Sequence, residues 1–246
     1  ICNTIIDSLE KKKYCSAVFL DIQQAFDKVW HSGLLFKLKN VLPAPYYMFF
    51  QSYLSNRYFY VKINNKVSNI HQIEAGIPQG SVLGPVLYTL FTYDMPTRDD
   101  ITVATYADDT AFISSQQSPT EASYILQLQL DNLQHWLTKW NIVVNTQKSN
   151  HITFTLCRAN CPPVFLNGTA IPSKEEVKYL GLHLDRRLTW KRHINAKRKQ
   201  LDIKFKQMYW LLGPKSQLSL ENKVLLLKTI LKPIWILRLS KLFVNI

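Results

Sequence analysis

Two adjacent aspartates interrupt a β-rich apolar stretch, and this pair constrains the fold more than any other feature of the chain. Residues 101–114 read ITVATYADDTAFIS, with Asp108 and Asp109 near the middle. Burying an unpaired carboxylate is costly, and a second like charge beside it adds to the cost. The stretch therefore predicts a β-hairpin that exposes both aspartates at its tip. An ordinary turn and a metal site both explain the pair at this point.

The positive charge of the chain is concentrated in its last third. The 246 residues carry a net charge of +13. Residues 174–246 contain 17 Lys and Arg against 5 Asp and Glu, whereas residues 1–173 contain 13 against 12. Hydrophobic residues make up 47% of the chain, which is typical of a globular rather than a disordered protein. A basic part on a nearly neutral body predicts a polyanionic partner, either nucleic acid or an anionic membrane surface.

Several features argue against a secreted, membrane-spanning or zinc-binding protein. The chain begins at Ile1 without a signal-peptide pattern and reads as a fragment of something longer. Lys228 and Lys232 interrupt the apolar stretch near the C-terminus well short of the ~20 apolar residues of a membrane span. Cys157 and Cys161 lack a second pair at zinc-finger spacing. We therefore expect reduced thiols and an intracellular location, in either the nucleus or the cytoplasm.

Residue patterns predict mixed α and β structure first and helices afterwards. Residues 118–140 predict the longest helix, in which Ser118 and Glu121 form a capping box and apolar residues recur at helical spacing. Further predicted elements are a strand at 16–22, helices at 31–41 and 46–54, a hairpin around Asn64 and Asn65, a loop and helix over 74–91, a hairpin at 164–171, strands at 150–156 and 177–185, and basic helices after 190. This order predicts an α+β body over residues 1–185 and a basic helical part over residues 186–246.

Three carboxylates form a candidate metal-binding set. Asp21 is expected at the end of a strand, and Asp108 and Asp109 at the tip of a hairpin. Mg²⁺ prefers carboxylate oxygens, and two such ions about 4 Å apart need shared negative ligands. In two-metal phosphoryl transfer, one ion lowers the pKa of an attacking hydroxyl and the other stabilises the leaving pyrophosphate.

Five blocks of sequence resemble, in order and spacing, motifs A to E of the reverse transcriptase palm. They read FLDIQQAFDKVWH, GIPQGSVLGP, YADD, NTQKSN and VKYLGLHLD. The first two blocks and the later ILKPIW are similar to non-LTR (LINE-type) retrotransposons of the insect jockey group. The resemblance covers essentially the whole chain. It implies a right-hand polymerase palm, with an antiparallel sheet and helices on one face, over residues 1–185. A basic helical thumb would follow over residues 186–246.

The resemblance also implies an activity and its partners. It implies an RNA-directed DNA polymerase that adds dNTPs to the 3′-OH of a DNA primer on an RNA template. Two Mg²⁺ ions would serve as cofactors, with Mn²⁺ as a substitute, and no membrane partner is expected. The alternatives are a decayed, inactive copy that only binds nucleic acid, a two-metal palm protein such as a nucleotide cyclase, and a nucleic-acid scaffold without chemistry. GIPQGS and the basic tail argue against a cyclase, which needs no template grip.

The resemblance assigns the first group of roles to residues of the metal site. The expected metal ligands and catalytic residues are Asp21, Asp108 and Asp109, and the carbonyl of Ile22 is a further candidate ligand. Tyr106 completes the YADD block and is expected to contact the nucleotide or the template. The other aspartates match no motif position as metal ligands, and we interpret them as surface or loop residues. They are Asp27, Asp94, Asp99, Asp100 and Asp185.

A second group of roles concerns the nucleotide and the template. Phe26 is the expected steric gate against a ribose 2′-OH, although an aromatic residue taken alone is more commonly a core residue. Gln79 is expected near the incoming nucleotide and template, and Gly76 and Gly80 would let the backbone approach nucleic acid closely, unless they belong to a plain loop. Lys148 would protonate the pyrophosphate or offset its charge, whereas a lone lysine is more often a solvated surface residue. The turn in VKYLGLHLD would grip the primer.

Two departures from the family pattern limit the expected activity. Only 20 residues precede Asp21, and Lys11, Lys12 and Lys13 do not form a convincing triphosphate clamp. The end, LRLSKLFVNI, differs from the usual continuation after KPIW. We therefore expect a truncated palm and thumb that by itself extends a primer poorly, because positioning supplies much of phosphoryl-transfer catalysis.

Overall fold

A four-stranded antiparallel sheet forms the centre of the computed structural model, which describes residues 1–234. The strands lie in the order β6-β7-β1-β8, so that the first strand in sequence pairs with β7 on one side and β8 on the other. Their bounds are β1 Tyr14–Asp21, β6 Thr102–Tyr106, β7 Asp109–Gln116 and β8 Asn150–Phe154. Six consecutive residues of β1 are buried, which shows that both faces of the sheet are covered.

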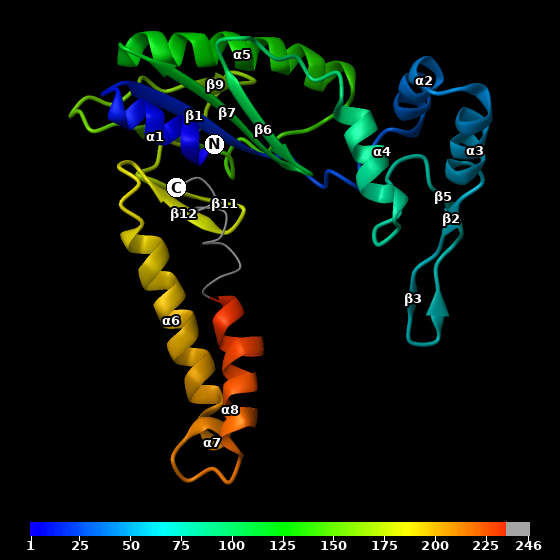
Figure 1. The fold of residues 1–246 in the computed structure, drawn as a ribbon. Helices are drawn as coiled ribbons and strands as arrows, with labels where there is room; N and C mark the ends of the chain where they lie inside the picture. The colour runs from blue at the N-terminus through cyan, green and yellow to red at the C-terminus, as the bar shows by residue number, and fades with distance from the viewer. Residues whose placement is uncertain (235–246) are drawn as a thin grey trace.

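The long helix α5, Pro119–Lys139, covers one face of the sheet (Figure 1). Its predicted apolar stripe is buried, with Leu126 and Leu130 fully inaccessible, and it packs on Val18 and Phe112 of the sheet. Ser118 is the N-cap as predicted, but its side chain makes no capping hydrogen bond within residues 1–234, so the predicted capping box is wrong. Burial of the stripe, rather than the cap, therefore holds this helix in place.

The other face is covered by helix α1, Cys2–Glu10, and by a hairpin of β11, Glu176–Tyr179, and β12, Leu182–Asp185. Ile5 of α1 and Val177 of β11 belong to the same buried cluster as Phe19 on β1. Side chains alternate between the two faces of β1, so one strand serves two cores. The sequence did not predict α1.

The single strand predicted over residues 177–185 is wrong, because β11 and β12 pair antiparallel across a two-residue turn. The turn residues Leu180 and Gly181 both have positive φ angles, 45° and 74°. Such a turn matches the twist of a hairpin. Leucine rarely adopts this conformation, so only the glycine of the two residues indicated a turn in the sequence.

The segment between β1 and β6 extends from one end of the sheet, as Figure 1 shows on the right. The predicted helices and the hairpin around Asn64 are confirmed there. The elements are α2 His31–Val41, α3 Ala44–Leu54, β2 Tyr58–Phe59, β3 Lys62–Ile63, β4 Lys66–Val67, β5 His71–Gln72 and α4 Leu83–Thr92. The hairpin predicted at 164–171 is also confirmed, as β9 Phe165–Leu166 and β10 Thr169–Ala170.

The C-terminal helices form an arm that points away from the sheet (yellow to red in Figure 1). They are α6 Lys191–Gln207, α7 Tyr209–Leu212, α8 Leu220–Leu226 and the π-helical η1 Leu227–Leu231. The apolar face predicted for α6 is only partly covered, since Ile194 and Phe205 are each 44% exposed, because few elements pack beside the arm. The sequence LRLSKLFVNI lies outside the described residues. No helix within residues 1–234 has the length and apolar character needed to cross a bilayer.

A buried histidine in β8 makes the stability of this sheet sensitive to acid. The Nε2 atom of His151 lies 2.8 Å from Oγ of Ser16, and the whole side chain is inaccessible. Burial lowers the pKa of His151 from about 6.5 to about 4. Because the folded-state pKa is depressed, the unfolded chain binds more protons between these two values. The contribution of the neutral His151 to the free energy of unfolding is therefore fully present above pH 6.5, and it is lost as the pH falls towards 4.

We expect the free energy of unfolding to fall by about 2 kcal/mol between pH 7 and pH 5 through His151 alone. Urea unfolding at the two pH values would measure this loss in the parent chain and in His151→Gln, which cannot take up the proton. The exposed His135 supplies the matched control, as His135→Gln. An equal acid loss in the parent and in His151→Gln would contradict the assignment.

Candidate active site

The structure brings the ends of β1 and β7 together at one edge of the sheet. Asp21, the last residue of β1, is the direct cross-strand partner of Asp109, the first residue of β7. Such partners have Cα atoms about 4.5–5.5 Å apart. Asp108 occupies the preceding turn beside Ala107, whose φ angle is 54°. The predicted hairpin is confirmed, and three aspartates from two distant parts of the chain lie next to one another.

The electrostatics of this edge are dominated by unneutralised carboxylates. Burial raises the pKa of Asp109 above its ordinary value, and the charges of Asp108 and Asp21 raise it further. The pKa of Tyr179 rises to about 12, first through burial and then through the charge of Asp109. Burial and the charge of Asp108 also raise the pKa of Tyr88. The edge therefore has a negative potential that a bound cation would relieve.

The donor set fits a divalent metal ion in its chemistry but does not form a closed cage. Within residues 1–234, no three His, Cys, Asp or Glu side chains are gathered closely enough to hold an ion as they stand. Like charges repel in the absence of a cation, so a looser arrangement of Asp21, Asp108 and Asp109 is the expected state of the protein alone. Carboxylate oxygens remain the ligands that hard cations such as Mg²⁺ prefer.

A cavity of about 900 Å³ opens beside the aspartates. Asp109 and Tyr106 line it on the side of the sheet, and the turn of β11–β12 at Leu180 and Gly181 lines it on the other side. The phenol of Tyr179 donates a hydrogen bond to the carbonyl of Ala104 at 3.4 Å, which links the two hairpins. The site is thus a cleft with the carboxylate of Asp109 on one side and a hairpin turn on the other.

Ile22 and Phe26 follow β1 closely. Ile22 forms an antiparallel bridge with Val144, and the two hydrogen bonds around it use the carbonyls of Asp21 and Val143, so the Ile22 carbonyl is not one of their acceptors. Phe26 is half-buried, with its ring 4.9 Å from that of Tyr88 between centroids. Phe26 therefore contributes to the core and still reaches the surface.

The glycine-rich loop after β5 contacts the protein itself. Nε2 of Gln79 donates a hydrogen bond to Oδ1 of Asp27 at 2.8 Å. Gly76 has a φ angle of 96°, and a Cβ atom there would lie 2.8 Å from the backbone oxygen of Asp27. The close approach predicted for nucleic acid at Gly76 is therefore an approach to the chain's own backbone. Gly80, with a φ angle of 82°, faces open space.

The NTQKSN block is tied to the end of β1. Oγ of Ser149 accepts a hydrogen bond from the backbone of Asp21 at 3.1 Å and donates to the carbonyl of Asn145 at 2.8 Å. Asn145 also donates its own backbone N–H to the Asp21 carbonyl at 2.8 Å. Lys148 is exposed on this short turn. The sequence missed Ser149, because a buried serine carries no local signal of the strand that it supports.

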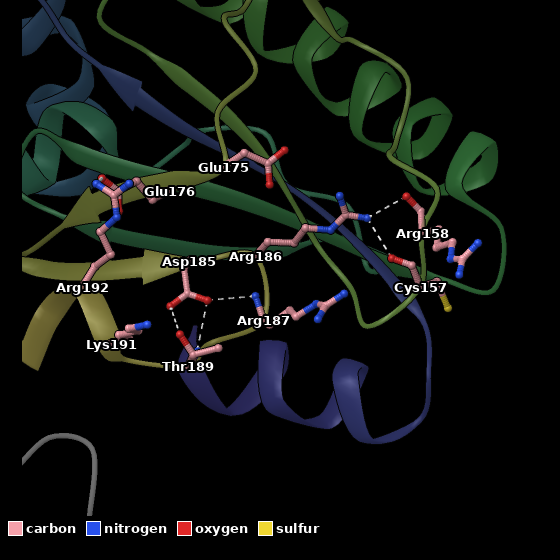
Figure 2. A pocket seen from close by; sticks show the side chains of 10 residues that line it. All are labelled: Cys157, Arg158, Glu175, Glu176, Asp185, Arg186, Arg187, Thr189, Lys191 and Arg192. Atoms are coloured by element: carbon pink, nitrogen blue, oxygen red, sulfur yellow. Dashed lines mark hydrogen bonds and ion pairs between the residues drawn. The ribbon is translucent and has the colours of Figure 1, made fainter.

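Two aspartates interpreted as surface or loop residues have defined structural partners. Asp94 lies exposed in a turn, as interpreted, and forms an ion pair with the buried Lys37. Asp185 accepts hydrogen bonds from the backbones of Arg187 and Thr189, each at 3.1 Å, and from the Thr189 hydroxyl at 2.9 Å (Figure 2). Both side chains stabilise local structure through these bonds.

Figure 2 shows a second cavity, of about 570 Å³, lined mostly by charged side chains. Arg186 donates to three backbone carbonyls, those of Cys157, Arg158 and Ala159, and Arg192 pairs with Glu176 at 2.9 Å. The cavity lies near the start of β1, whereas Asp21 ends that strand. These contacts hold the loops after β8 and β12 together.

Comparison with known proteins shows the family. The reverse transcriptase (RNA-dependent DNA polymerase) family matches residues 3–184. The chain is 43% identical over 241 residues to the RNA-directed DNA polymerase from mobile element jockey of Drosophila melanogaster, covering 95% of this chain and 26% of that protein. It is 42% identical over 240 residues to the probable RNA-directed DNA polymerase from transposon X-element of the same species, covering 96% of this chain and 26% of that protein. The chain thus spans about a quarter of the length of these relatives.

Solved structures of telomerase from Candida tropicalis share the fold. One, of the apo protein truncated from its C-terminal domain, has a TM-score of 0.52 at 14% identity and covers 77% of this chain and 38% of that chain. Another, in complex with a fragment of telomeric RNA, has the same TM-score and identity and covers 98% of this chain and 42% of that chain. Identity this low shows the fold alone, whereas the family match and the jockey relatives confirm the resemblance seen in the five sequence blocks: the chain belongs to the reverse transcriptase family.

Proposed function

We propose that this chain carries the palm of an RNA-directed DNA polymerase of a non-LTR retrotransposon, which joins dNTPs to the 3′-OH of a primer. The observation that carries the proposal is the meeting of Asp21, Asp108 and Asp109 at one edge of the sheet, beside an open cleft. The raised pKa of Asp109 supports it, because a site that accumulates negative charge is suited to cations.

The three aspartates would hold two divalent ions, Mg²⁺ or in its place Mn²⁺. When bound, these ions supply activation of the primer hydroxyl and neutralisation of the pyrophosphate charge. The chain itself supplies rigidity, because Asp21 and Asp109 belong to paired strands and Ser149 fixes the backbone of Asp21. The Ile22 carbonyl is a further candidate ligand at the same edge.

Other side chains would bind and orient the substrates. Phe26 reaches the surface beside β1, where its ring would exclude a ribose 2′-OH. Gln79 and Gly80 lie on an exposed loop that would meet the nucleotide and template. Tyr106 lines the cleft, where it would contact the nucleotide or the template, and the opposing β11–β12 turn would hold the primer end. Lys148 would offset the charge of the leaving pyrophosphate.

The basic C-terminal part would bind the RNA template and DNA primer through their phosphates. Helix α6 is rich in Lys and Arg and exposes most of its side chains. Cations on such a surface follow a phosphate backbone without reading its sequence. We therefore assign residues 1–185 to the palm and residues 186–246 to the thumb, in a polymerase that acts inside the cell.

A primer-extension assay tests this function. The chain, joined to the flanking segments of the jockey relative, is mixed with an RNA template, an annealed DNA primer and dNTPs. We expect cDNA synthesis that requires Mg²⁺ or Mn²⁺ and stops with EDTA, and binding whose log affinity falls linearly with log salt. A second candidate is a copy that only binds nucleic acid, which the exposed Lys and Arg side chains of α6 would support without any chemistry. Salt-dependent binding without synthesis in either metal would establish that candidate instead.

A further inference from the structure

Two segments that carry proposed nucleotide-contacting residues are bonded to each other along their backbones. The first, residues 26–31, follows β1, and the second, residues 74–79, precedes α4. The N–H of Ile77 donates to the carbonyl of Phe26 and that of Gly76 to the carbonyl of Val29, each at 2.8 Å. The missing side chain at Gly76 permits this approach, because a Cβ atom would collide with the Asp27 carbonyl.

Two side chains reinforce this contact from opposite directions. The carboxylate of Asp27 accepts a hydrogen bond from Nε2 of Gln79 at 2.8 Å. Nε2 of His31, which is 8% exposed, lies 2.7 Å from the carbonyl oxygen of Gly76. A carbonyl oxygen can only accept, so Nε2 of His31 carries the hydrogen. The exposed Asp27 and the buried His31, both on the first segment, therefore bond to different residues of the second segment.

We propose that Asp27 and His31 are positioning residues that fix the Gln79 loop against the turn carrying Phe26, and that nucleotide selectivity depends on them. The inference rests on the proposed function, in which Phe26 and Gln79 contact the nucleotide. The backbone bonds make the loop and the turn one unit. A change at Asp27 or His31 therefore alters the spacing between Gln79 and Phe26, although neither residue touches the nucleotide.

The bond from Gln79 to Asp27 also decides which end of the Gln79 amide is presented. An ionised carboxylate accepts but cannot donate, so the nitrogen of the amide faces Asp27 and Oε1 faces away. Gln79 is exposed, and a free glutamine side chain samples many rotamers. A charge-assisted bond selects one of them. The loop therefore offers an oriented acceptor to a donor on the nucleotide or template.

Kinetics of the joined polymerase test the role of Asp27. We expect Asp27→Ala to raise the KM for dNTPs about tenfold with little change in kcat, and to lower the preference for dNTPs over rNTPs. Asp27→Asn, of the same shape, should recover part of the loss, because its oxygen can still accept. In a Gln79→Ala background, Asp27→Ala should have no further effect. Asp99→Ala, on an exposed loop, is the matched control.

His31 is tested by a pair of substitutions and by a second readout. His31→Phe keeps the ring but removes the N–H donor, whereas His31→Gln keeps a donor, so selectivity should fall in the first and partly recover in the second. Hydrogen exchange of the Gly76 and Ile77 amides, measured in the chain itself, should accelerate in His31→Phe while β1 stays protected.

The outcomes separate the two proposals. Additive effects of Asp27→Ala and Gln79→Ala, or unchanged selectivity in both Asp27→Ala and His31→Phe, would overturn the positioning role in an active polymerase. If no form synthesises cDNA, the proposed function fails. Amide exchange then tests only whether His31 holds the Gln79 loop against the turn that carries Phe26. Faster exchange in His31→Phe supports that role, and unchanged exchange overturns it.

Discussion

Asp108→Asn is expected to lower cDNA synthesis by the joined polymerase about 10³-fold without unfolding it. The substitution keeps the shape of the side chain but removes one of the negative charges that would hold the metal ions. Asp108 lies in the turn between β6 and β7 and is exposed, so the hairpin does not depend on its charge. The loss should therefore appear in the rate, and the Tm should stay within a degree or two of that of the parent.

Asp109→Asn separates stability from activity at the same edge. Burial and two neighbouring carboxylates raise the pKa of Asp109, which means that its charged form destabilises the folded state. Asp109→Asn should then match or exceed the parent in stability and still lose synthesis, as is common where function needs a strained group.

Single-turnover primer extension in Mg²⁺, together with thermal melting, measures both quantities. Asp99→Asn, on the exposed loop before β6, is the control for the loss of a negative charge elsewhere and should leave synthesis unchanged. Undiminished synthesis by Asp108→Asn would remove the aspartate pair from the chemistry.

Local pattern was sufficient to predict the hairpin of β6 and β7, the end of β1 and the stripe of α5. Each of these depends on neighbours in the sequence: a polar pair between two apolar runs, a polar residue after an apolar run, or apolar residues at helical spacing. The first two of these patterns place Asp109 and Asp21 at strand ends. That the two aspartates lie close together was expected from the geometry of a two-metal site, and their direct pairing is seen only in the register.

The parts that the sequence did not predict depend on contacts between distant residues. Ser149 supports Asp21 across 128 positions, and Gly76 is needed because the Asp27 backbone passes within reach of its missing side chain. Leu180 adopts a left-handed conformation because the β11–β12 pairing requires it. None of these residues differs in type from many others that have no such role, so only the fold reveals them.

Lys37 and Asp94 are the clearest example of such a long-range contact. The ammonium of Lys37, 2% exposed, forms an ion pair with Asp94, which is 32% exposed, and lies 3.7 Å from the centroid of the Trp140 ring. Burial lowers the pKa of Lys37, and the carboxylate of Asp94 opposes that shift. Nε1 of Trp136 donates to the same carboxylate at 3.0 Å. One carboxylate therefore compensates a buried charge and a buried N–H group between α2, α4 and α5.

The two partners of this pair should respond unequally to substitution. Asp94→Ala leaves the Trp136 N–H group without its acceptor and the Lys37 charge without its counter-ion, with only the Phe91 carbonyl still accepting from Lys37. We expect it to lower the free energy of unfolding by about 3 kcal/mol. Lys37→Met fills the buried space with an apolar chain and leaves Asp94 in contact with water and Trp136, so a loss of about 1 kcal/mol or less is expected. Urea unfolding at pH 7 measures both. Equal losses would mean that mutual attraction, rather than the cost of an uncompensated buried charge, governs the pair.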